Sequence, residues 1–281
     1  MNATGGYDRA LRDEYADVPD AWEPPEAVGA IATPDFVLGH GEVHIWRAAL
    51  DLPPAQMATL SLLLSDDERD RAARFRFDRD RDRFVAARGL LRTLLGRYLG
   101  TEPGAIRFVY DCRCGSPHCR PEHRKPALAP ACGDWLRFNL SHADGLALVA
   151  LAEVREVGVD LERIGEDQPW GELAELAGAI FTPREFADLS ALPAQECHAA
   201  FFACWTRKEA YTKARGIGLS APLDQFVVPI ATPDHGAFAG VLADSSGMPW
   251  SLYDLAPGHG YVGALAVAGM VARLRCRSWP T

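Results

Sequence analysis

Two short segments of the chain carry charged side chains at spacings that suit a metal ion and a phosphate. The first, Gly158-Val159-Asp160-Leu161-Glu162, ends an apolar run that begins at Gly145 and reads as one strand because small and β-branched residues dominate it. Residues two apart in a strand point to the same side, so Asp160 and Glu162 project together. Two such carboxylates repel each other unless a cation lies between them, and a hard divalent cation with oxygen ligands is the natural candidate.

The second segment, Trp205-Thr206-Arg207-Lys208-Glu209-Ala210-Tyr211-Thr212-Lys213, has a helical pattern. Glu209 and Lys213 are four residues apart and therefore lie on one helix face. Taken singly, an Asp-x-Glu at a strand end is usually solvated, and a Glu–Lys pair at this spacing is usually a surface pair of about 0.3–0.5 kcal/mol. Together, three acids and a lysine suit a magnesium-bound pyrophosphate better than a core. We predict Asp160, Glu162 and Glu209 as metal ligands, with Mn²⁺ able to replace Mg²⁺.

The two segments, about 40 residues apart, resemble the signature of the Sfp-type 4'-phosphopantetheinyl transferases. The resemblance extends over roughly residues 41 to 270. It implies an α+β fold of two similar α/β halves related by a pseudo-twofold, with coenzyme A and the active site in the cleft between them. It also implies transfer of the 4'-phosphopantetheine group of coenzyme A to a serine of an apo acyl or peptidyl carrier protein, with release of adenosine 3',5'-bisphosphate. The catalytic residues would be Asp160, Glu209 and Lys213.

Two other classes of function use the same residues. A magnesium-dependent nucleotide hydrolase would cleave its substrate without modifying any carrier protein. An inactive homologue would only bind coenzyme A or a carrier protein, although the intact Asp160, Glu162, Glu209 and Lys213 argue against it. The sequence does not identify the carrier protein, the pathway or whether acyl-coenzyme A is accepted.

An arginine-rich run from Glu68 to Arg97 is the strongest basic feature of the chain. Its ten arginines and five acids leave a local charge of +5. The simple interpretation is an exposed helix with many ion pairs, but arginine also binds phosphate in a bidentate manner. The resemblance implies contacts from this run to the 3'-phosphate of coenzyme A, and the matching positions are Arg71, Arg83 and Arg88.

Two further motifs add candidate phosphate ligands. Lys125-Pro126 resembles the Gly-Lys-Pro step of the family, with Arg124 in place of glycine, and Lys125 would contact the coenzyme phosphates. Phe138-Asn139-Leu140-Ser141-His142 resembles the Phe-Asn-x-Ser-His motif, in which Ser141 and a partly cationic His142 can bind phosphate oxygens. A Ser-His pair also occurs in hydrolases, but the chain has no Gly-x-Ser-x-Gly elbow.

A cysteine-rich stretch lies between these motifs. Cys112, Cys114 and Cys119 with His118 or His123 could bind zinc. The spacing is poor for zinc, because Cys-x-Cys is not the usual knuckle and adjacent histidine and cysteine rarely reach one metal. We therefore favour a loop with reduced thiols, which also agrees with seven cysteines and no export signal.

The elements that position these residues follow from hydrophobic pattern and capping signals. We expect a first strand at 42–48, a helix start at Ser65 with Glu68 three residues later, a helix buried on one face from Phe84 onward, a capping box at Thr182 and Glu185, and a helix at 199–213. Four short strands should follow, at 226–230, 237–242, 250–255 and 261–267. We divide the chain into a loosely ordered extension (1–40), an N-terminal half with the basic arm and Cys-rich insert (41–153), and a C-terminal half with the metal site and catalytic helix (154–281).

The composition sets the remaining expectations. With 281 residues, 48% hydrophobic and 24% charged, the chain is typical of globular proteins. No apolar run of about 18 residues predicts a membrane span, and the N-terminus lacks a secretion signal, so we expect a cytoplasmic monomer. The net charge of −9 disfavours binding to nucleic acid or anionic membranes. A carrier protein should then dock on a local patch, for which the helix after Pro183 and the segment from Arg207 to Gly218 are candidates.

Overall fold

The computed structural model describes residues 22–23, 36–111, 125–165, 168–218, 222–230, 238–243 and 247–280. Its strands are Glu42–Ala49 (β1), Phe108–Asp111 (β2), Lys125–Leu128 (β3), Leu136–Ala143 (β4), Leu146–Glu153 (β5), Val157–Arg163 (β6), Phe238–Ala243 (β7), Pro249–Leu255 (β8), Tyr261–Ala268 (β9) and Arg273–Ser278 (β10). Its helices are Pro54–Ser61 (α2), Asp66–Ala72 (α3), Asp78–Leu99 (α4), Trp170–Ile180 (α5), Pro183–Ser190 (α6) and Ala194–Arg215 (α7).

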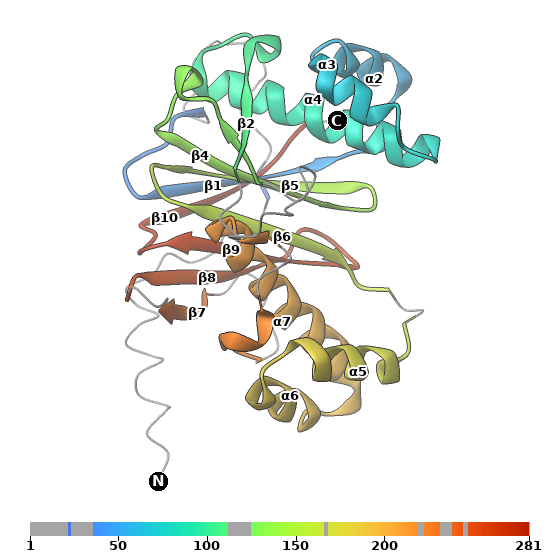
Figure 1. The fold of residues 1–281 in the computed structure, drawn as a ribbon, viewed down its shortest axis with the longest axis vertical. Coiled ribbons are helices and arrows are strands. Elements are labelled where there is room, and N and C mark those ends of the chain that lie inside the picture. The colour runs from blue at the N-terminus through green and yellow to red at the C-terminus, as the bar shows by residue number, and fades with distance from the viewer. Residues whose placement is uncertain are drawn as a thin grey trace.

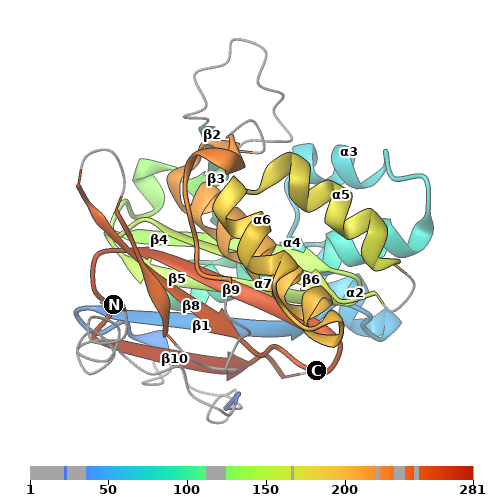
Figure 2. The same ribbon diagram turned by 90° about the horizontal axis from the view of Figure 1, so that it is seen from below.

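The described strands form two four-stranded sheets, with orders β10-β1-β5-β4 and β6-β9-β8-β7, and a ribbon of β2 and β3. The two sheets lie one above the other, with α4 outside the first and α7 outside the second (Figure 1). Figure 2 shows that α5 and α6 also lie on the α7 side of the second sheet. The predicted α+β fold with two α/β halves is confirmed.

Each strand in the middle of this stack is buried on both faces. In β5, Leu148 belongs to the cluster between the sheets, whereas Val149 packs toward α4 with Trp46 and Leu91. The cluster between the sheets also contains Val159 of β6. Because both faces need apolar side chains, these strands read as nearly continuous apolar runs.

Helix starts agree with the capping signals in the sequence. Ser65 and Thr182 each accept a hydrogen bond from the backbone of the N3 residue, and Glu68 and Glu185 return a bond to the cap, so both capping boxes are confirmed. A capping box satisfies backbone N–H groups that have no partner inside the helix. α4 and α7 each have 22 residues, and each is the long helix of its half.

Two expectations about the elements were wrong, and one strand was missed. The apolar run from Gly145 to Val159 is two strands in different sheets, because the chain turns after β5 through Val154, whose φ is 57°. Residues 226–230 are not a strand and instead follow a 3-10 turn at Leu223–Gln225. β10 was not expected; it comes from the end of the chain and pairs in parallel with β1 of the first sheet.

Some predictions fall on residues outside the described ranges. These are most of the extension at 1–40 and the possible zinc ligands Cys112, Cys114, His118, Cys119 and His123. None of the described helices is long and apolar enough to cross a membrane.

Candidate active site

The site lies where the edges of the two sheets meet. β4 is the edge strand of the first sheet and β6 is the edge strand of the second. Gly158 of β6 allows α7 to pack directly on this strand, because a Cβ on Gly158 would lie only 2.1 Å from the backbone oxygen of Ala210. This contact places Asp160 and Glu162 of β6 next to the face of α7 that carries Lys213.

Five side chains from three elements form the centre of the site. Lys213 Nζ contacts Asp160 Oδ1 and donates a hydrogen bond to Ser141 Oγ of β4 at 2.9 Å. Ser141 Oγ in turn donates to Asp160 Oδ1 at 3.1 Å. Asp160 is 2% exposed, so this arrangement holds a buried carboxylate beside an ammonium and a hydroxyl. Trp205 Nε1 donates to Glu162 Oε1 at 3.0 Å and orients the second acid.

The acids of this group destabilise one another's charged forms. Burial raises the pKa of Glu209 to about 7, and the carboxylates of Asp160 and Glu162 add to the rise while Lys213 opposes it. Burial and then Asp160 raise the pKa of Glu162. Such shifts arise when carboxylates share a poorly hydrated site. The group would therefore gain stability from an added cation, or from protons.

The donor set fits a hard divalent cation. Asp160 Oδ2 and Glu209 Oε1 are buried and have no hydrogen-bond partner, which is costly unless something else binds them. Carboxylate oxygens are the ligands that Mg²⁺ prefers. As the side chains stand, no three His, Cys, Asp or Glu residues within the described ranges form a group that could hold a metal ion. Lys213 and Trp205 occupy oxygens that a metal would compete for.

A pocket of about 250 Å³ opens beside this group and is lined by cationic side chains. None of the described residues that line it is acidic. Five of the predicted site residues line it: Arg71, Arg88, Lys125, His142 and Lys213. A concave site with four cations and no lining acid suits a ligand with several phosphate charges.

The pocket cations are held in different ways. Arg71 lies over the ring of Phe84, at 5.2 Å from its centroid, and is exposed to solvent. Arg88 is buried, and Glu68 binds its Nη2 at 2.6 Å. The surrounding protein partly desolvates His142 and lowers its pKa, and the charges of Lys213 and two arginines lower this pKa further, although the residue is exposed and lines the pocket. A lowered pKa makes His142 mainly a neutral hydrogen-bonding group near pH 7 until an anion binds.

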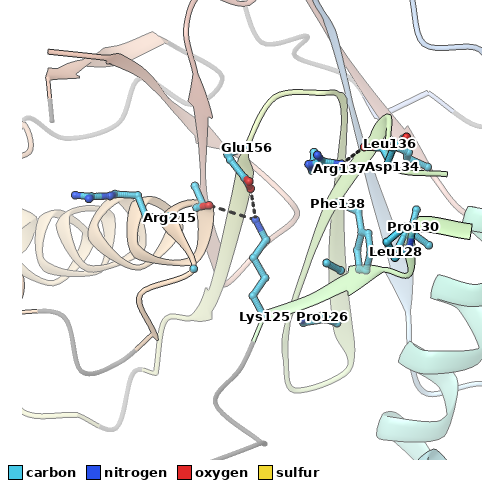
Figure 3. A pocket seen from close by; sticks show the side chains of 13 residues that line it. Lys125, Pro126, Leu128, Pro130, Asp134, Leu136, Arg137, Phe138, Glu156 and Arg215 are labelled. Carbon is cyan, nitrogen blue, oxygen red and sulfur yellow. Dashed lines mark hydrogen bonds and ion pairs between the residues drawn. The ribbon is translucent and has the colours of Figure 1, made fainter. Parts of the chain in front are cut away.

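Lys125 lines this basic pocket and also lines a second pocket of about 240 Å³, which Figure 3 shows. Its Nζ donates to the backbone oxygens of Val157 at 2.9 Å and Ala214 at 3.3 Å, and it pairs with Glu156 at 3.3 Å. Lys125 therefore joins β3 to the start of β6 and the end of α7. Its side chain lines the basic pocket, but its ammonium is directed toward the C-terminal half of the chain.

Two predicted phosphate ligands lie elsewhere. Arg83 does not line the pocket, because it makes a bidentate pair with Asp51 at 2.7 and 2.8 Å. Its charge still lowers the pKa of His142. Ser141 is turned toward Asp160 and Lys213 rather than toward the pocket. A role of either residue in binding coenzyme A stays a prediction.

Several charged residues near the motif are structural. Arg207 is 2% exposed and makes a bidentate pair with Asp254, so it cannot contact a docked protein. Lys208 is completely buried and pairs with Glu185 at 2.9 Å. Helical periodicity places both on the helix but gives no signal that they are buried, because most charged helix residues are exposed.

Sequence reasoning gave no role to Asn139, although it lies inside a motif that was recognised. Its Oδ1 accepts a hydrogen bond from the backbone N–H of Val159 at 2.9 Å, and it is 4% exposed. Asn139 also lines the basic pocket. The sequence held one signal for such a role: an asparagine stands among apolar residues of a strand, and a buried amide needs hydrogen-bond partners.

Comparison with known proteins identifies the family of the chain. Residues 156–266 match the model of the 4'-phosphopantetheinyl transferase superfamily, and residues 53–154 match that of the 4'-phosphopantetheinyl transferase N-terminal domain. The chain is 41% identical to the 4'-phosphopantetheinyl transferase HetI of Nostoc sp. PCC 7120, over 84% of this chain and 92% of HetI. It is 28% identical to the 4'-phosphopantetheinyl transferase Sfp of Bacillus subtilis strain 168, over 66% of this chain and 76% of Sfp. The chain therefore belongs to the 4'-phosphopantetheinyl transferase superfamily, in its two-domain Sfp type, and is an enzyme that transfers 4'-phosphopantetheine from coenzyme A to carrier proteins.

Proposed function

We propose that the group around Asp160 is the catalytic centre and that the adjoining basic pocket binds the nucleotide part of coenzyme A. The observation that carries this proposal is the pairing of a buried acidic group with a pocket lined by four cations and no described acid. In the reaction, the carrier serine Oγ forms a bond to the β-phosphorus of the coenzyme diphosphate. The bond from that phosphorus to the bridging oxygen breaks, and adenosine 3',5'-bisphosphate leaves.

The residues of the chain would share the work as follows. Glu209, a buried carboxylate beside Asp160 and Lys213, would accept the proton of the carrier serine. Lys213 neutralises the charge that develops on the leaving phosphate. Arg71, Arg88, Lys125 and His142 position the phosphates, and positioning supplies much of the rate of phosphoryl transfer.

Asp160, Glu162 and Glu209 would hold a magnesium ion. When bound, it would neutralise charge on the diphosphate. The unpartnered oxygens of Asp160 and Glu209 support this assignment, and their chemistry would accept Mn²⁺ as well. The observed contact between Lys213 and Asp160 supplies positive charge to this carboxylate without the metal.

We also propose that the enzyme acts as a cytoplasmic monomer. The three predicted catalytic residues, Asp160, Glu209 and Lys213, meet across β6 and α7 of one chain. The exposed Phe186 on α6 and Leu176 on α5 are the apolar side chains of the carrier-docking surface that we propose. Light scattering after size exclusion tests the monomer, and a Phe186→Ser variant should raise the KM for the carrier protein and leave that for coenzyme A unchanged.

Intact mass spectrometry tests the proposed function. Several apo carrier proteins are incubated with the enzyme, coenzyme A and magnesium, and we expect one phosphopantetheine adduct on the carrier serine. Asp160→Ala should abolish the adduct while the variant stays folded, and excess chelator should do the same to the native enzyme. Cleavage of coenzyme A without an adduct would identify a hydrolase, and full activity in chelator would refute the metal site.

A further inference from the structure

The edge of β6 has backbone groups that none of the described strands pairs with. β6 forms its backbone ladder with β9 on one side only. In an antiparallel pair, the N–H and C=O groups of alternate residues point away from the partner strand. At Val157 and Val159 these outward groups meet side chains of the first half. Lys125 Nζ donates to Val157 O at 2.9 Å, and Asn139 Oδ1 accepts from Val159 N at 2.9 Å.

These side chains replace a backbone ladder between the two sheets. The hydrogen bond of Asn139 is buried, and the residue that it fixes directly precedes Asp160. Two residues farther along β4, Ser141 donates to the carboxylate of Asp160 itself. Asn139 and Ser141 of β4 thus contact two consecutive residues of β6, Val159 and Asp160.

We propose that Asn139 is a positioning residue that sets the register of β6 against β4 and so aims Asp160 at Ser141 and Lys213. This inference rests on the proposed function of Asp160. The amide is neutral, so it fixes the strand without changing the charge of the acidic group. Loss of the bond leaves the Val159 N–H without a partner and frees the edge of β6 to shift. A displacement of about 1 Å at a catalytic group can cost about a hundredfold in rate.

Three variants separate positioning from binding and from simple stability. Asn139→Ala removes the acceptor, and Asn139→Asp keeps an acceptor oxygen at the same place. Ser251→Ala is the matched control, because it removes one hydrogen bond of a buried residue in β8, from Ser251 Oγ to Gly269 O at 2.6 Å. The measurements are kcat, the KM for the carrier protein, the dissociation constant of coenzyme A, and hydrogen exchange of the Val159 amide by NMR.

We expect Asn139→Ala to lower kcat by about tenfold to a hundredfold, with the dissociation constant of coenzyme A within about twofold of the native value. Its Val159 amide should exchange faster, whereas Asn139→Asp should keep that amide protected. Ser251→Ala should lower the melting temperature and leave kcat unchanged. An unchanged kcat in Asn139→Ala, or weaker coenzyme binding with kcat intact, would overturn the proposal; the second result would make Asn139 a ligand of the coenzyme.

Hydrogen exchange keeps this test independent of the proposed function. If the native enzyme modified no carrier protein, the proposed function would fail, and the exchange of Val159 would still report whether Asn139 fixes β6. If Asn139→Ala did not fold, Asn139→Asp would decide. An unprotected Val159 amide in a folded Asn139→Asp variant would show that the acceptor does not hold the strand.

Discussion

Replacing Gly158 by alanine should damage the active site more than any other change of one methyl group. The added Cβ would lie 2.1 Å from Ala210 O, 2.3 Å from Ala214 N and 2.8 Å from Ala214 Cα. All three are backbone atoms of α7, so no side-chain rotation can relieve the contact. Helix and strand must separate by about 1 Å before the contacts become ordinary, and this separation moves Glu209 and Lys213 away from Asp160.

Two effects follow from that separation. Overpacking of a filled core costs about 1–3 kcal/mol of unfolding free energy. Misplacement of catalytic groups by about 1 Å can lower kcat by about a hundredfold. We therefore expect a Gly158→Ala variant that is folded, less stable by chemical denaturation, and nearly inactive in the carrier-modification assay.

Gly171→Ala provides the matched control. Gly171 lies in α5, and a Cβ there would meet nothing within 4 Å. Alanine favours a helix over glycine by up to about 1 kcal/mol, so this variant should be as stable as the native enzyme or more stable, with unchanged kcat. If Gly158→Ala matched Gly171→Ala in both stability and kcat, direct packing of α7 on β6 would not be what sets the site.

Three other changes test separate parts of the site. The pKa of Glu209 is raised from 4.5 to about 7, so ionisation of this carboxyl destabilises the metal-free protein as pH rises through that window. Glu209→Gln should therefore stabilise the metal-free protein by about 2–4 kcal/mol at pH 8 but not at pH 4. Equal melting curves of the two proteins at pH 8 would contradict this. Arg71→Ala should weaken coenzyme A by about 1–3 kcal/mol but spare dephospho-coenzyme A, as calorimetry can measure; equal losses would show that Arg71 does not contact the 3'-phosphate. Lys208→Met should cost about 3–5 kcal/mol in urea unfolding, because it leaves the buried carboxylate of Glu185 without its cation. A loss below about 1 kcal/mol would refute the role of that pair.

Local periodicity predicted which side chains of the site share a face. The spacing of two in β6 and of four in α7 is a property of a single strand or helix. The sequence is therefore sufficient to predict that Asp160 and Glu162 share one side of β6 and that Glu209 and Lys213 share one face of α7. Their meeting across two elements depends on a tertiary contact, and only the resemblance to a family predicted it. Gly158 makes that contact, yet a lone glycine in a strand does not say what approaches it.

Burial of charge was the main feature that the sequence did not reveal. Arg207 and Lys208 lie in a charged stretch of a helix, which ordinarily faces solvent, but each is buried against an acid from a distant segment. Pairing of this kind depends on where Asp254 and Glu185 arrive in the fold. The same limit applies to β10. Its partner strand β1 is more than 200 residues away in the sequence, so local pattern cannot predict the pairing.

The arrangement of the sheets explains why the site needs both halves. Ser141 and Lys125 come from the first half, whereas Asp160, Glu209 and Lys213 come from the second, and no single sheet carries a complete set. The apolar cluster between the sheets fixes their separation, but apolar packing does not specify register along a strand. Directional contacts must supply that register, and the bonds from Lys125, Asn139 and Ser141 to β6 are the ones placed to do so. Lys125 and Asn139 would then serve a second purpose, because both line the basic pocket proposed for coenzyme A and both also hold the strand that carries Asp160.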